Sequence, residues 1–253
     1  MDVISRIASL SADGEPFCLA TIIASTRPDV PIGLKAVVLR DGTMEADAWP
    51  ANLGPALRVL ALGALTEKKS RTVEAEAGVL AFLDVVYSGV RLLICGAGHI
   101  ALPLARFARE TGFKVTVLDD RPDFAQPARF PGCEVIAEAF VPALRGMPLG
   151  PSTYAVVITR GHEHDVECLA EILPKETAYA GLIGSRRRVG FVLDLLGKKG
   201  ISRERLNEVF TPIGVPIGSE SPEEIALSIA AELVCVRRRG ALPAQALRAG
   251  GRK

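Results

Sequence analysis

The chain has 253 residues, which is enough for two modest hydrophobic cores. Hydrophobic residues make up 49% of it and the formal net charge is +1, so we expect neither disorder nor a partner among nucleic acids. Five scattered cysteines without a C-x-x-C pair are typical of reduced thiols. No signal peptide and no apolar run of membrane-spanning length is visible, so we expect a cytoplasmic protein without a membrane partner.

The first third of the chain has the pattern of a small α+β domain. Residues 1–11 have the apolar spacing of an amphipathic helix. The pair Asp41-Gly42 directly follows an expected strand, and residues 44–48 could be the hairpin partner of that strand, so we expect antiparallel pairing. The expected strands are residues 17–24, 34–39, 44–48, 71–75 and 78–86, and the expected second helix is 54–65.

From residue 91 onward strands alternate with helices, which is typical of βαβ units around a parallel sheet. The boundary is placed near Ser88-Gly89. Residues 1–88 then form the smaller α+β domain, and residues 89–253 form an α/β domain with helices on both faces of its sheet. The expected strands are 91–94, 114–118, 134–137, 154–159 and 178–183; the expected helices are 99–111, 165–173 and 185–198; residues 142–152 are expected as a loop or crossover.

The last long helix has a clear start. Ser221 is the expected N-cap, Pro222 fits the first helical position, and Glu224 completes a capping box. The helix should end at the basic run 237–239, which suits its C-terminus. The tail after Gly240 is predicted to be loose.

A glycine-rich turn follows the first strand of the second domain. Gly96-Ala97-Gly98-His99-Ile100-Ala101 matches G-x-G-x-x-G/A, the phosphate-binding turn of Rossmann-type domains, between a strand and a helix as required. The second glycine would let a phosphate approach the backbone, and the helix N-terminus would attract it. We therefore expect Gly96, Ala97, Gly98, His99 and Ile100 to bind a cofactor. The alternative is a Rossmann-like core that has lost its ligand.

Two acids end the next strand. Asp119-Asp120 lie about 20 residues after the turn, where an acid can hold the ribose hydroxyls of a dinucleotide. Asp119 has the alternative of closing a turn with Arg121. His99, at the expected start of the helix, either donates to a phosphate or faces solvent.

Two further polar segments follow strands and should therefore lie at the same edge of the sheet. The first holds Arg160, His162 and His164, followed by Asp165. The two histidines could bind a metal together with Asp165, but Asp165 is also a plain helix N-cap, and we favour polar ligand contacts over a permanent metal. The second segment is Gly184-Ser185-Arg186-Arg187-Arg188, where arginines at a helix start suit an anion.

The sequence assigns no catalytic residue. It contains no G-x-S-x-G, no H-E-x-x-H and no P-loop. Cys95 abuts the glycine turn, where a helix N-terminus would lower the pKa of a thiol. An NAD(P)-dependent oxidoreductase, with Asp119 on the ribose and His162 or His164 as the acid or base, is one function that these residues allow.

Seven segments occur in an order that resembles the Rossmann domain of the XdhC/CoxI family. The resemblance covers residues 91–235. Near the N-terminus the family's G-S-x-P-R segment and glycine pair are not intact, and residues 25–28 and 46–50 stand roughly in their places. The matching segments are residues 94–101, Asp119-Asp120-Arg121-Pro122, Arg129-Phe130-Pro131, residues 159–165, residues 181–187, Pro216-Ile217-Gly218 and residues 221–226.

The resemblance implies an accessory protein rather than an enzyme with its own turnover. Members of the family bind the molybdenum cofactor (a molybdopterin), protect it during sulfuration and assist its insertion into a molybdenum hydroxylase such as xanthine dehydrogenase or carbon monoxide dehydrogenase. The implied partners are that client hydroxylase and a sulfurtransferase, and we expect a homodimer. The glycine turn, Arg186 and Arg187 would hold the phosphate, while His99, His162 and His164 would face the pterin.

Overall fold

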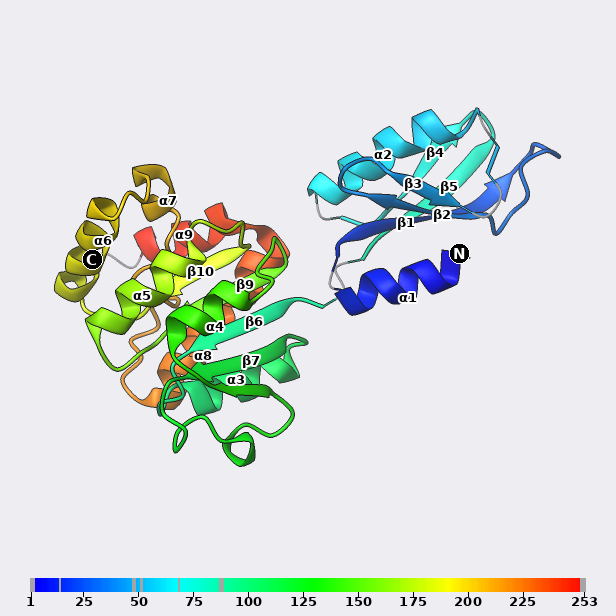
Figure 1. Ribbon diagram of the computed structural model, residues 1–253. Helices are drawn as coiled ribbons and strands as arrows, with labels where there is room; N and C mark the ends of the chain where they lie inside the picture. The colour runs from blue at the N-terminus through cyan, green and yellow to red at the C-terminus, as the bar shows by residue number, and fades with distance from the viewer. Residues whose placement is uncertain are drawn as a thin grey trace. The chain divides into compact units, whose positions relative to one another are not determined.

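A computed structural model describes residues 3–13, 15–46, 49–50, 52–67, 69–86 and 89–250, with the side chains of 12–13, 186, 242 and 247–250 excepted. The chain divides into two compact units, Met1–Gly89 and Val90–Lys253. Each unit has its own five-stranded sheet (Figure 1). Among the described residues, no helix combines the length and the apolar character needed to cross a bilayer.

The first unit is built on an antiparallel sheet with the strand order β3-β2-β1-β5-β4. Alternate residues of the central strand pack on opposite faces. Cys18 and Ala20 contribute to the core that contains Leu57 of α2, while Phe17 packs with Leu10 of α1. The predicted α+β character is confirmed. The elements are α1 (Val3–Asp13), β1 (Phe17–Ser25), β2 (Lys35–Leu39), β3 (Met44–Ala46), α2 (Gly54–Glu67), β4 (Arg71–Glu76) and β5 (Val79–Val86).

The second unit is built on a parallel sheet with the strand order β10-β9-β6-β7-β8. This is the Rossmann-like sheet that the sequence predicts. The strands are β6 (Arg91–Cys95), β7 (Lys114–Asp119), β8 (Glu134–Ala137), β9 (Thr153–Val157) and β10 (Tyr179–Leu182). The helices are α3 (Ala101–Glu110), α4 (Phe140–Gly146), α5 (His162–Ile172), α6 (Arg186–Lys198), α7 (Arg203–Asn207), α8 (Pro222–Arg239) and α9 (Ala241–Gly250), with a 3-10 turn at Pro127–Arg129.

Helices cover both faces of this sheet, as predicted (Figure 1). Ile94 of β6 packs with Leu104 of α3 and Ile229 of α8 on one face. Leu93, its neighbour in the chain, packs with Leu169 of α5 on the other face, in a core that α4 and α6 also join. The sheet is therefore buried on both sides, which explains why its strands are nearly continuous apolar runs.

The predicted start of α8 is confirmed. The Ser221 hydroxyl accepts a hydrogen bond from the Glu224 backbone N–H, and the Glu224 carboxylate accepts one from the Ser221 N–H. Deeper in the helix, the fully buried Glu232 accepts hydrogen bonds from the Tyr179 hydroxyl and from the Gly214 N–H at 3.0 Å. The loop before α8 is thus held by side chains of the helix that it precedes.

Two predictions of irregular structure were wrong. Residues 140–146, partly assigned to a loop because of their Pro and Gly content, form α4, in which Pro142 occupies the first turn, where a proline is tolerated. The tail after Gly240 forms α9 rather than a loose end, because Ala244 is buried in the core that contains α3 and α8. The helices that follow β6 and β9 also begin elsewhere than predicted, α3 at Ala101 and α5 at His162.

Candidate functional site

The strand order locates the candidate site. β6 lies between β7 and β9, and the chain leaves β6 toward one side of the sheet and later returns on the other side. In such sheets the crevice for a ligand opens at the carboxyl ends of the strands where the order reverses. Here these are the ends of β6 and β9, which lead into residues 96–100 and 158–164.

The glycine turn is shaped by both of its glycines, for different reasons. Gly96 has a φ of +112°, and a Cβ there would lie 2.5 Å from the Ile158 carbonyl oxygen, so the end of the neighbouring strand requires a glycine. At Gly98 a Cβ would meet no atom within 4 Å. Open space therefore lies beside Gly98, where the sequence predicts that a phosphate approaches.

Backbone donors lie beside this space. Among the described residues, none accepts a hydrogen bond from the N–H groups of Gly98, His99 and Ile100. Ile100 precedes α3 and supplies no side-chain cap, so the positive end of that helix is also open. The arrangement can hold an anion by backbone N–H groups.

Asp119 is hydrogen bonded, through its carboxylate, to groups within the protein. Its carboxylate is 1% exposed and accepts hydrogen bonds from the Ala97 N–H at 2.7 Å and from Arg121 Nε and Nη2, both at 2.8 Å. Burial alone would raise its pKa, but these hydrogen bonds outweigh burial and hold the pKa of Asp119 at about 2. The turn with Arg121, one of the two roles that the sequence allows, is present, and the carboxylate also fixes the glycine turn.

Asp120 and Arg160 form a bidentate ion pair, with distances of 2.6 Å and 2.8 Å. The hydrogen bonds from Arg160 lower the pKa of Asp120. Asp120 follows β7 and Arg160 follows β9, the two strands that flank β6. The pair therefore crosses the carboxyl end of β6, and Arg160 remains 42% exposed there.

The two histidine side chains, which the sequence suggested could face one ligand, contact different neighbours. His162 and His164 lie in the first turn of α5, not on a loop, and residues two apart on a helix point about 200° apart. The His162 ring lies 5.4 Å from the ring of Phe191. The His164 ring lies 5.3 Å from that of Phe140, and its Nδ1 is 3.0 Å from the Glu167 carboxylate. His99 is exposed in the glycine turn.

The metal ligands that the sequence suggests do not come together at this edge. In the parts of the chain that the structure describes, no three His, Cys, Asp or Glu residues form a group that could hold a metal ion. Asp165, the suggested third ligand, is fully buried inside α5, and Gly161 takes the N-cap position instead.

Asp165 belongs to a buried polar cluster that the sequence analysis missed. Its carboxylate accepts hydrogen bonds from the Thr159 hydroxyl at 2.6 Å and from Arg188 Nε at 2.8 Å. Burial is the largest effect on the pKa of Asp165 and raises it, although both partners oppose the rise. Arg188 thus links the start of α6 to α5, and its guanidinium is hydrogen bonded to Asp165 rather than available to a ligand. An acid and an arginine at two helix starts were the only signal in the sequence.

The remaining loop, after β10, supplies exposed groups. Ser185 is the N-cap of α6, and its hydroxyl accepts a hydrogen bond from the Arg188 N–H at 3.3 Å. Arg187 is exposed in the first turn, and Gly184 has a φ of +149°. The Arg186 side chain lies outside the described residues.

Cys95 does not form an exposed nucleophile. It ends β6, is fully buried, and lies beside the equally buried Cys168 of α5. Burial, reinforced by the hydrogen bond with Cys95, raises the pKa of the Cys168 thiol well above its usual value. The two thiols are core side chains beneath the turn.

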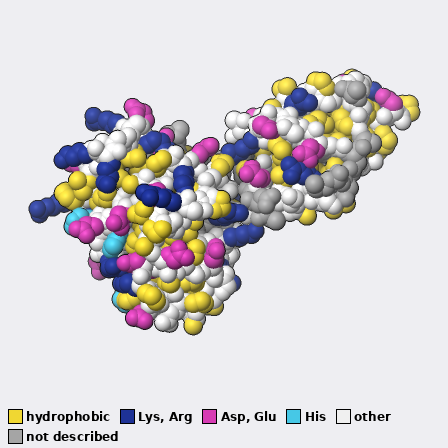
Figure 2. Space-filling view, in the orientation of Figure 1, with side chains coloured by type: hydrophobic (Ala, Val, Ile, Leu, Met, Phe, Trp, Pro, Cys, Tyr) yellow, Lys and Arg dark blue, Asp and Glu magenta, His cyan; other side chains and the backbone are white. Residues whose placement is uncertain are grey.

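Electrostatic attraction to the site depends on local groups. On the faces that Figure 2 shows, basic and acidic side chains are interspersed over both units. The formal net charge of +1 gives no strong overall field, so an anion would be attracted by the N–H groups and arginines at the strand ends.

The second unit is similar to a domain of known proteins. The family model of the XdhC Rossmann domain matches residues 92–233. A protein of Bacillus subtilis strain 168, named as a probable subunit of xanthine dehydrogenase, is 35% identical over 162 residues, which cover 64% of this chain and 47% of that protein. The uncharacterized protein YqeB of Escherichia coli K12 is 28% identical over 94% of this chain and 46% of that protein.

The fold has a close counterpart among solved structures. A crystal structure of a xanthine dehydrogenase from Bacillus halodurans superposes with a TM-score of 0.73 at 24% identity, covering 97% of this chain and 70% of the other. The chain spans about half the length of the curated relatives it matches. Because the Rossmann-domain match extends over more than half of its residues, the chain belongs to the XdhC family.

Proposed function

We propose that the second unit binds the phosphate end of the molybdenum cofactor as cargo and passes the cofactor to a molybdenum hydroxylase of the xanthine dehydrogenase type. The observation that carries the proposal is the open space at Gly98 beside three backbone N–H groups that have no acceptor among the described residues. Phosphate is the group that such a turn takes in Rossmann-type domains.

The groups around the turn fit a phosphorylated pterin better than a dinucleotide. A dinucleotide needs an acid free to hold its ribose, and the Asp119 carboxylate is already hydrogen bonded to Ala97 and Arg121. Arg160 and Arg187 are exposed at the same edge and can add charge-assisted hydrogen bonds to the phosphate. His99 can donate to the same ligand. In this arrangement the protein supplies binding and shielding, and the chemistry stays with the cargo.

The client is inferred from the relatives. One of them is named as a probable component of xanthine dehydrogenase, and this chain covers 47% of its length. We infer that the present chain assists maturation of such a hydroxylase. A sulfurtransferase that acts on the bound cofactor, and a homodimer that encloses it, are further parts of the proposal.

Anaerobic titration with molybdopterin tests the binding step. We expect a Kd in the micromolar range or tighter for the full chain and at least tenfold weaker binding for Gly98→Val, whose side chain would fill the open space. Gly190→Val, at an equally open position on α6, is the matched control and should bind like the parent. No binding in the micromolar range would disprove the proposal.

The same titration with NAD and NADP separates the proposal from the oxidoreductase that the glycine turn alone would allow. We expect either nucleotide to bind at least tenfold more weakly than molybdopterin. Tighter binding of NAD or NADP, lost in Gly98→Val, would replace the cofactor-carrier proposal with the oxidoreductase.

A further inference from the structure

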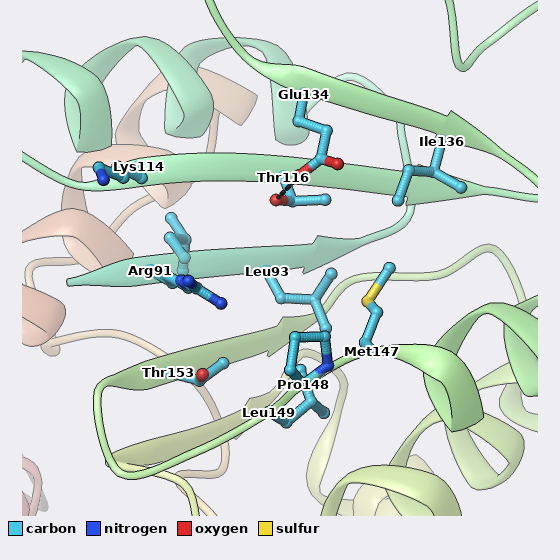
Figure 3. A pocket seen from close by; sticks show the side chains of 11 residues that line it. Arg91, Leu93, Lys114, Thr116, Glu134, Ile136, Met147, Pro148, Leu149 and Thr153 are labelled. Atoms are coloured by element: carbon cyan, nitrogen blue, oxygen red, sulfur yellow. Dashed lines mark hydrogen bonds between the residues drawn. The ribbon is translucent and has the colours of Figure 1, made fainter. Parts of the chain in front are cut away.

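A second hollow opens at the opposite end of the same sheet. Its volume is about 360 Å³, and it lies where β6, β7, β8 and β9 begin (Figure 3). Arg91 pairs with Lys114 across β6 and β7, and Thr116 pairs with Glu134 across β7 and β8. Because side chains alternate along each strand, these four and Leu93 emerge on one face. We call this site the strand-start hollow.

The hollow exists because the covering helix is short. α4 ends at Gly146 and packs against α5, so within the described part of the second unit no helix contributes to the lining of the hollow. The chain crosses there as an irregular segment, from which Met147 and Leu149 line the hollow. Leu93 and Ile136 contribute further apolar surface from the sheet. The hollow is therefore largely apolar along one side.

Cations lie at its other end. Figure 3 shows Arg91 and Lys114 together, away from Met147 and Leu149. Within the described part of the chain, the Lys114 ammonium has no carboxylate at ion-pair distance. The carboxylate of Glu134 accepts a hydrogen bond from the Thr116 hydroxyl at 2.8 Å. The charged side chains of the lining are thus two cations, Arg91 and Lys114, and one carboxylate, Glu134.

We propose that the strand-start hollow binds a small organic anion with an apolar body, such as a carboxylate or sulfonate on an aromatic skeleton. The anionic group lies at Lys114 and Arg91, and the body packs against Leu93, Ile136 and Met147. This pairing follows the usual composition of small-molecule sites, which are apolar with a few charged groups that fix orientation. The site shares no residue with the glycine turn and does not depend on the function proposed above.

Methionine NMR gives a reporter inside the hollow. The chain has three methionines, Met1, Met44 and Met147. Protein labelled with 13C at the methionine methyl groups therefore gives few signals, and Met147→Leu assigns the one of interest. Titration with naphthalene-1-sulfonate should move the Met147 signal saturably and leave the Met44 signal in place. An unmoved Met147 signal would overturn the proposal.

Variants then test the role of charge. Lys114→Ala should weaken naphthalene-1-sulfonate binding at least fivefold, whereas Lys198→Ala, an exposed lysine at the end of α6, should not change it. The neutral 1-naphthalenemethanol should bind Lys114→Ala and the parent equally. Gly98→Val should retain sulfonate binding, which separates this result from any failure at the cofactor site. Equal sulfonate affinity in Lys114→Ala and the parent would disprove the anion site.

Discussion

Arg160 and Asp120 meet across the carboxyl end of β6, joining the segments that follow β9 and β7 by two hydrogen bonds of 2.6 Å and 2.8 Å. Arg160 Nη1 lies 4.0 Å from the Asp119 carboxylate, which accepts a hydrogen bond from the Ala97 N–H of the glycine turn, so an anion bound at the turn would compete with Asp120 for the arginine. The ion pair thus keeps Arg160 near the turn and, at the same time, partly neutralises it.

Removal of the competing carboxylate should strengthen anion binding. We expect Asp120→Asn to bind molybdopterin two- to fivefold more tightly than the parent, because Arg160 then interacts with the phosphate alone. The loss of stability should stay below about 1 kcal/mol, as for other partly exposed ion pairs. Calorimetry measures the affinity, with Asp194→Asn on α6 as the control. Weaker binding by Asp120→Asn would show that the pair positions Arg160 instead of restraining it.

The two glycines of the turn should respond differently to the same substitution. Gly96→Ala should destabilise the second unit by about 2–4 kcal/mol, because a positive φ and a contact with the Ile158 carbonyl both oppose a side chain. Gly98→Ala, which adds its methyl group to open space, should unfold at nearly the parent's temperature. Thermal unfolding measures both. Equal losses would mean that the space at Gly98 closes in solution.

Two neighbouring arginines at the start of α6 should have different roles: Arg188 stabilises the fold, and Arg187 binds the ligand. Arg188→Ala leaves the buried Asp165 carboxylate with Thr159 as its remaining side-chain partner and should cost about 3–5 kcal/mol. Arg187→Ala should leave the unfolding temperature unchanged and weaken molybdopterin binding about tenfold, the value of one charge-assisted hydrogen bond. Urea unfolding and calorimetry distinguish them. A stability loss in Arg187→Ala would contradict the assignment.

The contribution of Asp119 should depend on acid pH. Its folded pKa of about 2 lies below the ordinary 3.8, so the ionised carboxylate stabilises the fold above about pH 4, and this stabilisation is lost as the pH falls toward 2. The difference amounts to about 2 kcal/mol. The gap in unfolding free energy between the parent and Asp119→Asn should therefore narrow by about 1.5 kcal/mol from pH 5 to pH 2.5, because part of the carboxylate is still ionised at pH 2.5. A constant gap would argue against the tight Asp119–Arg121 pair.

Local signals in the sequence predicted the framework of the site. The strand before Gly96, the glycine turn and the capping box at Ser221 are all present, because each depends on a few adjacent residues. The start of α5 was misplaced because Asp165 resembles an N-cap, whereas Gly161 occupies that position without a side-chain hydrogen bond.

Contacts between distant residues could not be predicted in the same way. Asp165 and Arg188 are 23 positions apart, and Asp120 and Arg160 are 40 apart. Nothing in either segment identifies its partner until the parallel strands bring their ends together. The orientation of His162 and His164 likewise depended on one fact, namely that the helix begins at His162.

The five residues of β6 separate the glycine turn from the strand-start hollow, since Gly96 follows the strand and Arg91 begins it. At about 3.3 Å per residue this strand is roughly 17 Å long, about twice the Debye length of about 8 Å at physiological ionic strength. The interaction between solvent-exposed charges bound at the two ends is therefore largely screened. Anions bound at the two proposed sites would therefore repel each other only weakly, and any strong coupling between them would have to be transmitted mechanically through the strand.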